Sequence, residues 1–133
     1  MSEQNVEIVR RAFAKVVIPG DPEAMVAASH PKFEMELVGI GGGPVHYTGA
    51  AGIRDFFRDV GETWESFRFE ATDIRDLGQS VLVLGDVHGC GRGSGVEVND
   101  QWAWIIEMKG GQAMSLRGYL DHSAALEAAG LAR

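Results

Sequence analysis

Three ionisable side chains, Asp86, His88 and Asp121, stand where predicted strands could present them to a common pocket. In the segment "VLVLGDVHG", strand alternation places Asp86 and His88 on one face, two residues apart. A histidine is a natural general base near neutral pH, and a neighbouring carboxylate can orient its ring and support its charged form. The residues therefore predict acid/base chemistry if their face lines a cavity. If the opposite, valine-rich face packs the core instead, they face only solvent.

Asp121 occupies the join between a strand and a helix in "LRGYLDHSAALEAAG", residues 116–130. The pleat of the strand places it on the same face as Arg117 and Tyr119. Aspartate is also among the best helix N-caps. Asp121 could therefore cap the final helix, project into a pocket, or do both.

Aromatic side chains are a second group of residues that could line a ligand pocket. Trp102, Trp104 and Ile106 share one strand face. Large rings can line an apolar ligand cavity, but an ordinary core or a dimer interface uses them equally well. We expect Trp104 to be the one that reaches a pocket.

The segment "GIGGGPVHYTG", residues 39–49, is predicted to be a flexible loop because it contains three successive glycines. Such a loop could form the mouth of a cavity, with His46 and Tyr47 where a substrate passes. A plain connection between two elements is the alternative.

The elements that must position these residues follow from hydrophobic periodicity. Helical spacing predicts a helix over residues 6–16, a second that starts at Asp21-Pro22 and stops before His30, and a third over 50–64. Alternation predicts strands, and the chain closes with a short helix before Gly130. The expected strands are 32–38, 66–75, 80–90, 96–108 and 113–121. Early helices and late strands indicate an α+β domain with helices on one face of a curved, mostly antiparallel sheet.

Composition limits the partners. The chain has 133 residues, enough for one domain, and its net charge of −7 argues against a nucleic-acid or anionic-membrane partner. No run approaches 18 apolar residues and "SEQN" lacks a signal-peptide start, so we expect a cytoplasmic protein.

Cys90 is the sole cysteine and the histidines lack ligand spacing, so no metal is expected. The glycines of "GCGRGSG" lack the spacing of a dinucleotide or phosphate loop, and no other cofactor is expected.

The element order and four stretches resemble the nuclear-transport-factor-2-like superfamily, and within it the SnoaL-like branch. The stretches are "VEIVRRAFA", "GDPEAMVAASHPKFE", "YTGAAGIRDFF" and the segment from "GRGSGVEV" to the C-terminal "AALEAAGL". The resemblance implies a single domain over residues 1–133 in which a bent sheet and three helices of the N-terminal half form a cone around a mostly apolar cavity. It also implies a homodimer through the outer sheet face.

The resemblance further suggests site residues. SnoaL-like cyclases pair a histidine with the aspartate of the last strand, which here corresponds to His88 and Asp121. The aspartate base of ketosteroid isomerases has no counterpart in "GIGGGPV", and their first-helix tyrosine is replaced by Phe13. The arginine that epoxide hydrolases place two residues before a middle-strand aspartate is replaced by Leu84. Of the three enzyme classes, the polyketide cyclase-like site has the fewest expected residues missing from this sequence.

Two functions remain open. The first is a cofactor-free isomerase, cyclase or hydrolase in which Asp121, His88 and Asp86 move a proton on a small apolar molecule. The side chains expected to contact that substrate are Tyr119, Arg117, Trp104, Tyr47 and Phe13. The second is a non-catalytic domain that binds a small molecule or only dimerises, because this fold does not determine function.

Overall fold

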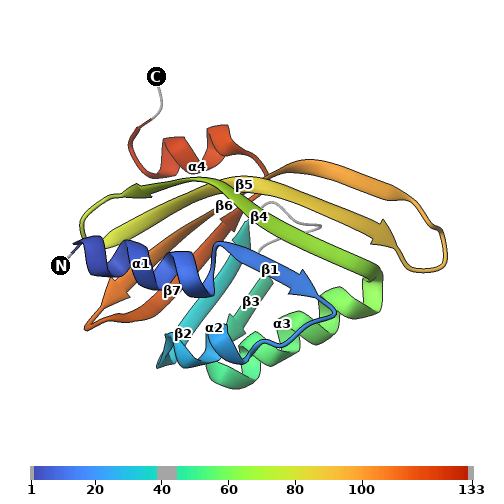
Figure 1. Cartoon of the computed structure of the whole chain (residues 1–133), viewed down its shortest axis with the longest axis horizontal. Coiled ribbons are helices and arrows are strands. Elements are labelled where there is room, and N and C mark those ends of the chain that lie inside the picture. The colour runs from blue at the N-terminus through green and yellow to red at the C-terminus, as the bar shows by residue number, and fades with distance from the viewer. Residues whose placement is uncertain (1, 39–44, 132–133) are drawn as a thin grey trace.

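A computed structural model describes residues 2–38 and 45–131 (Figure 1). Its helices are α1 (Ser2–Ala12), α2 (Glu23–Ala27), α3 (Gly49–Thr63) and α4 (His122–Ala128). Its strands are β1 (Lys15–Ile18), β2 (Ser29–Val38), β3 (Val45–Thr48), β4 (Trp64–Asp76), β5 (Ser80–Gly91), β6 (Glu97–Lys109) and β7 (Gln112–Tyr119). These strands form one sheet in the order β1-β4-β5-β6-β7-β2-β3. Neighbours pair antiparallel except β2 and β7, which are parallel.

Helices cover both faces of this curled sheet. Figure 1 shows α1, α2 and α3, in blue to green, on one side of the strands, and α4, in red, on the opposite side. We call the face covered by α1–α3 the inner face and the face under α4 the outer face. The space between the inner face and α1–α3 is the interior. The predicted α+β architecture with a curved, mostly antiparallel sheet is confirmed.

Strand alternation divides the apolar side chains between these two faces. On β5, Val81, Val83 and Val87 belong to the large inner cluster, which also includes side chains of α1, α2 and α3. Leu82 and Leu84 point the other way and join a smaller outer cluster with α4. The valine face of this strand therefore packs the main core.

Two glycines make room for rings on the inner face. A Cβ built on Gly118 would lie 2.8 Å from a ring carbon of Trp102 and 2.9 Å from one of Trp104. A Cβ on Gly85 would lie 2.8 Å from the ring of Phe69. Since these distances are too short for a side chain, the absence of one at Gly85 and Gly118 lets the aromatic rings approach the backbone of the sheet closely.

The start of the chain differs from the prediction. The first helix ends at Ala12 rather than near residue 16, and Lys15–Ile18 forms β1, paired antiparallel with β4. The β-branched run at residues 16–18 favours a strand, and every second residue of β1 is buried. Val16 therefore points inward, as the helical spacing predicted, but from a strand.

The segment before α3 differs as well. The predicted loop 39–49 includes β3 (Val45–Thr48), an edge strand paired with β2. Residues 39–44, which contain its three successive glycines, lie outside the described residues. β2 begins at Ser29, before the predicted start at residue 32. The other predicted strands and helices are confirmed to within a few residues, which is the usual precision of element boundaries.

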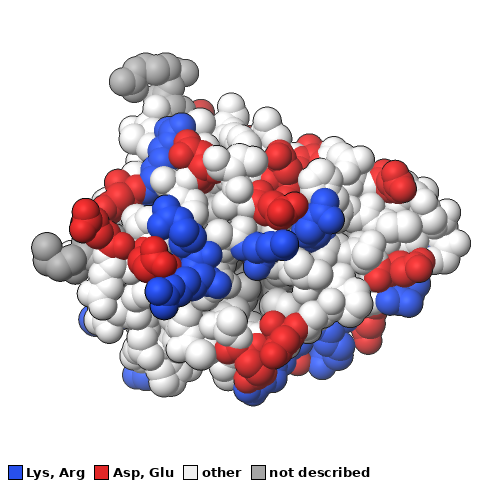
Figure 2. Space-filling model, viewed as in Figure 1, with Lys and Arg blue, Asp and Glu red and all other residues white. Residues whose placement is uncertain are grey.

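Charges of both signs cover the surface. In the view of Figure 2, a row of lysines and arginines crosses the middle of the face, with aspartates and glutamates above and below it. Most of the ion pairs are exposed, such as Arg54–Glu23 and Arg75–Asp73. None of the helices in the described part of the chain is long and apolar enough to span a membrane.

Candidate functional site

Asp121 is the N-cap of α4. Its Oδ1 accepts a hydrogen bond from the backbone N–H of Ala124 at 2.7 Å, and its backbone is extended, as an N-cap requires. The residue is exposed on the outer side of the sheet. The capping interpretation is confirmed, and the expectation that this carboxylate looks into the interior is wrong.

His122 anchors the same helix to the sheet, which the sequence did not indicate. Its ring Nε2 lies 2.7 Å from the carbonyl oxygen of Gly85, and its backbone N–H donates to the side-chain carbonyl of Gln101. Ala125 is fully buried against the outer cluster. A polar residue beside a predicted N-cap was the only available signal for this anchor.

Asp86 and His88 share a face of β5, as alternation predicted, but it is the outer face. Asp86 is half-buried, opposite Glu70 on one neighbouring strand and Gln101 on the other. The His88 ring lies within hydrogen-bond distance of the side-chain oxygen of Asn99. A closed pocket shared by His88 and Asp121 is not formed, because the valines of β5 occupy the inner face.

Arg117 and Tyr119 are brought together on the outer face of β7. They line a groove of about 500 Å³ beside the end of α4, together with Glu36 and His46. The guanidinium of Arg117 lies 2.9 Å from the Glu36 carboxylate, which also lies 3.5 Å from the His46 ring. The Tyr119 hydroxyl, and then Glu36, raise the pKa of Arg117. This groove is polar and open, unlike the expected apolar cavity.

Tyr47 is fixed against α3. Its hydroxyl donates a hydrogen bond to Asp59 at 2.8 Å, and its ring meets Phe56 edge to face. Burial, followed by the hydrogen bond to Asp59, raises the pKa of Tyr47 to about 12. The same hydrogen bond, with help from Arg58, lowers the pKa of Asp59. These contacts join β3 to α3, and the role expected for Tyr47 at a cavity mouth stays a prediction.

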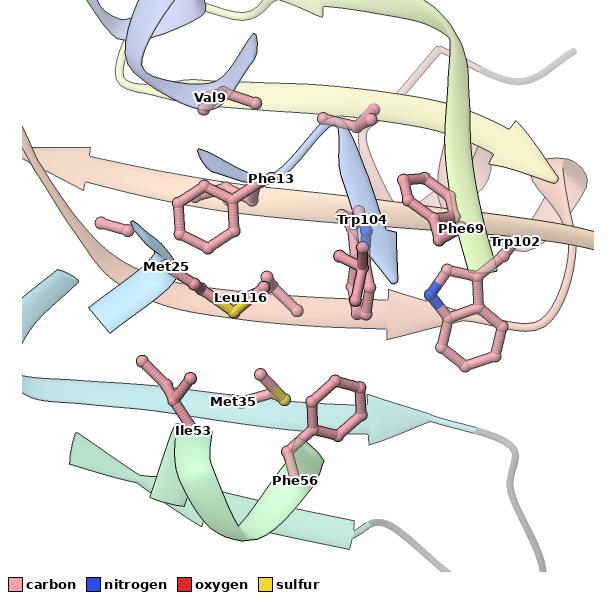
Figure 3. Close-up of a cluster of buried hydrophobic side chains, with 14 of the residues drawn as sticks. Val9, Phe13, Met25, Met35, Ile53, Phe56, Phe69, Trp102, Trp104 and Leu116 are labelled. Carbon is pink, nitrogen blue, oxygen red and sulfur yellow. The ribbon is translucent and has the colours of Figure 1, made fainter. Parts of the chain in front are cut away.

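Phe13 and Trp104 lie in the interior, on the opposite side of the sheet from Arg117 and Tyr119. Both belong to the inner cluster, with Phe13 fully buried and Trp104 2% exposed. Figure 3 shows Trp104 between Phe13 and Trp102, with Phe69 beside it. The Trp104 ring meets those of Trp102 and Phe69 edge to face, each at 5.5 Å between centroids.

The fully buried side chains of the described part of the interior are apolar. Among the described residues no polar or charged residue is buried, and the inner cluster consists of aliphatic, aromatic and methionine side chains. The polar side-chain atoms of this cluster include the indole nitrogens of its two tryptophans. The Nε1 atoms of Trp102 and Trp104 are buried and have no hydrogen-bond partner in the described part of the chain.

The described residues offer no metal site. Within 2–38 and 45–131, no group of three or more histidine, cysteine, aspartate or glutamate side chains is arranged to hold a metal ion. Cys90 is half-buried and free.

Three solved structures share this fold over nearly the whole chain. TerC, co-crystallised with polyporic acid, is 21% identical, with 96% of this chain and 98% of TerC covered and a TM-score of 0.73. A hypothetical protein with a ketosteroid isomerase-like fold from Catenulispora acidiphila, in complex with trimethylamine, is 18% identical, with 98% and 95% covered and a TM-score of 0.72. A protein from Jannaschia sp. named as a SnoaL-like polyketide cyclase is 19% identical, with 99% and 94% covered and a TM-score of 0.73.

These structural similarities show that the chain has the α+β fold of ketosteroid isomerase-like proteins. Among curated proteins, none matches the chain. The family model of the SnoaL-like domain matches residues 9–116, which is most of the sequence. The chain therefore belongs to the SnoaL-like domain family.

Proposed function

We propose that this protein binds a small, mostly apolar molecule in the interior of the cone and does not catalyse acid/base chemistry there. The observation that carries this proposal is that the ionisable candidate residues and the main apolar cluster lie on opposite faces of the sheet. Asp86, His88 and Asp121 are all on the outer face, whereas the inner face is apolar. A ligand among Phe13 and Trp104 would meet rings and methyl groups, and none of the buried side chains in the described part of the chain could move a proton.

The composition of the interior supports entry of a ligand. Met25, Met35 and Met108 are all in the inner cluster, and Figure 3 shows Met35 near Leu116 and Phe56. Methionine side chains are flexible and repack readily, so they can yield space that a branched side chain could not. Two proteins of the same fold were crystallised with small organic molecules, polyporic acid and trimethylamine.

The experiment is native mass spectrometry of the purified protein, followed by thermal-shift measurements with each molecule that it carries. We expect a bound apolar compound that raises the melting temperature and is recovered unchanged, since a ligand that binds only the folded state stabilises it. His88→Asn and Asp121→Asn should bind it as tightly as the wild type. Conversion of the compound, abolished in Asp121→Asn, would contradict the proposal and restore the enzyme hypothesis.

A second candidate function is acid/base catalysis in the outer groove. It is favoured by one observation, the convergence of Arg117, Tyr119, Glu36 and His46 around about 500 Å³, a volume typical of ligand sites. A cyclase-like reaction there would use the Tyr119 hydroxyl or the Glu36–His46 pair. Turnover lost in Tyr119→Phe but kept in Trp104→Phe would support this candidate over interior binding.

We also propose a cytoplasmic homodimer that associates through the uncovered part of the outer face, beside α4. Stable dimers bury roughly 800 Å² or more per partner, and the outer surface of β2 and β7 offers Glu36 and Arg117 as charges for such an interface. Light scattering coupled to size-exclusion chromatography should give twice the chain mass of 14.3 kDa. A mass of one chain at all concentrations would contradict it.

A further inference from the structure

A small hollow lies on the surface where the end of α1, strand β1, α2 and α3 meet. Its volume is about 240 Å³, which is below the roughly 300–1,000 Å³ of sites for drug-sized molecules. Among the described residues, its lining includes none from β5, β6 or β7, whereas Trp104 belongs to β6. The hollow is therefore a different place from the interior site proposed above, and it fits only a small molecule.

The floor of the hollow is apolar. Val16 of β1 and Met25 of α2 are buried, and Phe57 of α3 is half-buried against the main core. Val17 also lines the hollow and is 45% exposed, although its side chain is apolar. A ligand with an apolar part would remove this surface from water, which favours binding.

The rim of the hollow is basic. Arg11 in the last turn of α1 and Lys15 at the start of β1 both line it and are exposed. Figure 2 shows lysines and arginines gathered over α1 and β1. Asp21 is the one carboxylate among the described lining residues, and its Oδ1 accepts a hydrogen bond from the backbone N–H of Glu23 at 2.9 Å. Two positive charges against one negative charge favour an anion.

Arg11 keeps donors for such an anion. Its Nε lies 3.0 Å from the carboxylate of Glu7, and the same carboxylate lies 3.3 Å from Arg10. One glutamate is thus shared between two guanidinium groups. Because a guanidinium has five N–H donors, the contact with Glu7 leaves Arg11 able to bind a second carboxylate.

Lys15 is available as well. It takes part in no ion pair within the part of the chain that the structure describes. Its cross-strand neighbour is Glu70, but the Glu70 carboxylate is paired with Arg68 at 2.9 Å. The ammonium group of Lys15 is therefore the second cation that a ligand can use.

We propose that this hollow binds a small monocarboxylic acid with a short apolar chain. The carboxylate pairs with Arg11 and Lys15 at the rim, since charge-assisted hydrogen bonds to a carboxylate are the strongest that these groups make. The chain lies against Met25 and Phe57 on the floor. This inference goes beyond the proposed function and does not depend on a ligand in the interior.

Four probes separate the contributions of charge and chain: pentanoate, pentanamide, pentylamine and acetate. The first three share a five-carbon chain and differ in charge, and acetate lacks most of the chain. We expect pentanoate to bind about tenfold more tightly than pentanamide, because two exposed charge pairs are each worth about three- to fivefold. Acetate should bind about tenfold more weakly than pentanoate, because few CH₂ groups are buried, and pentylamine should not bind.

Nuclear magnetic resonance titration suits these probes, because ligands with so few atoms bind at roughly millimolar concentration. We expect pentanoate to move the methyl signal of Met25 and to leave that of Met114, which lines a different pocket, unchanged. Met→Leu variants assign the signals. Shifts of Met35 and Met108 without one of Met25 would place the probe in the interior, which would overturn this inference and leave the proposed function standing.

The charge is tested with Arg11→Gln and Lys15→Gln. Each should weaken the binding of pentanoate about three- to fivefold and leave that of pentanamide unchanged. Arg10→Gln is the matched control, since Arg10 also pairs with Glu7 but does not line the hollow. Equal affinities of pentanoate and pentanamide, or equal effects of Arg10→Gln and Arg11→Gln, would overturn the inference.

The space is tested with Ala24→Leu, which puts a larger side chain at an exposed position of the lining. It should abolish the shift of the Met25 methyl signal by pentanoate while both basic residues remain. Ala27→Leu, at an exposed position of the same helix outside the lining, should leave the shift intact. Unchanged binding of pentanoate to Ala24→Leu would show that the chain does not enter the hollow, and the inference would fail.

Discussion

The carboxylate of Asp121 accepts a hydrogen bond from the backbone N–H of Ala124 at 2.7 Å, and this contact fixes the start of α4 on the outer face of the sheet. The acidic residue at the end of the last strand thus has a structural partner. Trp104, in contrast, lies on the inner face. The candidate catalytic residues Asp86, His88 and Asp121 are therefore on the outer face, and the main apolar cluster is on the inner face.

The first prediction concerns the cap itself. Asp121→Ala should lower the free energy of unfolding by about 1 kcal/mol, because one N–H of the first turn of α4 loses its acceptor. Asp121→Asn should retain most of that stability, since asparagine caps equally well but cannot act as a base. Urea denaturation of the three proteins measures the difference. Equal stability of Asp121→Ala and wild type would show that the cap is not formed in solution.

The second prediction concerns the close approach of the sheet to the tryptophans. Gly118→Ala should destabilise the protein by about 1–3 kcal/mol, the usual range for overpacking, because the new methyl group would lie under 3.0 Å from both Trp102 and Trp104. Thermal unfolding measures this loss.

The control for that variant is Gly61→Ala in α3. There the new Cβ would lie 3.6 Å from Ile18, an ordinary contact, and alanine is favoured over glycine within a helix by up to about 1 kcal/mol. A stabilised Gly61→Ala beside a destabilised Gly118→Ala would locate the effect in the ring contacts. A neutral Gly118→Ala would mean that the tryptophans are not packed against β7.

The third prediction is a pH dependence. The folded pKa of Tyr47 is about 12, above the value of about 10 of a free tyrosine, so folding favours the neutral phenol. Stability from this group is therefore complete below pH 10 and is lost as the pH rises from about 10 to about 12. Tyr47→Phe should be less stable than the wild type at neutral pH, and the difference should shrink over that range.

Two measurements check this behaviour. Ultraviolet absorbance of the phenolate gives the titration of Tyr47 as the difference between wild type and Tyr47→Phe, and denaturation at each pH gives the stabilities. A Tyr47 titration near pH 10, with a pH-independent stability difference, would contradict the hydrogen bond to Asp59.

The fourth prediction concerns the hairpin of β5 and β6. The guanidinium of Arg92 donates to the carbonyl oxygen of Gly61 at 2.9 and 3.1 Å, near the end of α3. Arg92→Ala should lower the free energy of unfolding by about 1 kcal/mol, because two charge-assisted bonds to a helix C-terminus are lost. Arg75→Ala, which removes an exposed ion pair with Asp73, should change it little. Equal effects of the two variants, measured by urea denaturation, would contradict the role of Arg92.

Much of the fold could be predicted because periodicity reports burial. The alternation around Phe33 and the spacing around Ile53 correctly placed β2 and α3. The short strand β1 was missed because Val16 satisfies a helical repeat and a strand repeat equally well. β3 was missed because four residues are too few to show a clear alternation. The strand is stabilised by its pairing with β2, which the local sequence does not reveal.

The orientation of the faces could not be predicted. Alternation showed that Arg117, Tyr119 and Asp121 share a face, but either face of β7 could have lined the interior. Tertiary contacts determine which face is the inner one. The rings of Trp102 and Trp104 pack against Gly118, so the face of β7 that contains Gly118 is the inner face. The roles expected for Asp86, His88 and Asp121 required the opposite choice.

The most direct test of the account is the position of a bound ligand. Intermolecular nuclear Overhauser effects between the protein and the apolar compound that it carries through purification distinguish the two faces, because Trp104 is on the inner face and Tyr119 borders the outer groove. We expect contacts to the ring protons of Trp104 and none to those of Tyr119. Contacts to Tyr119 without any to Trp104 would contradict the claim that the interior is the binding site.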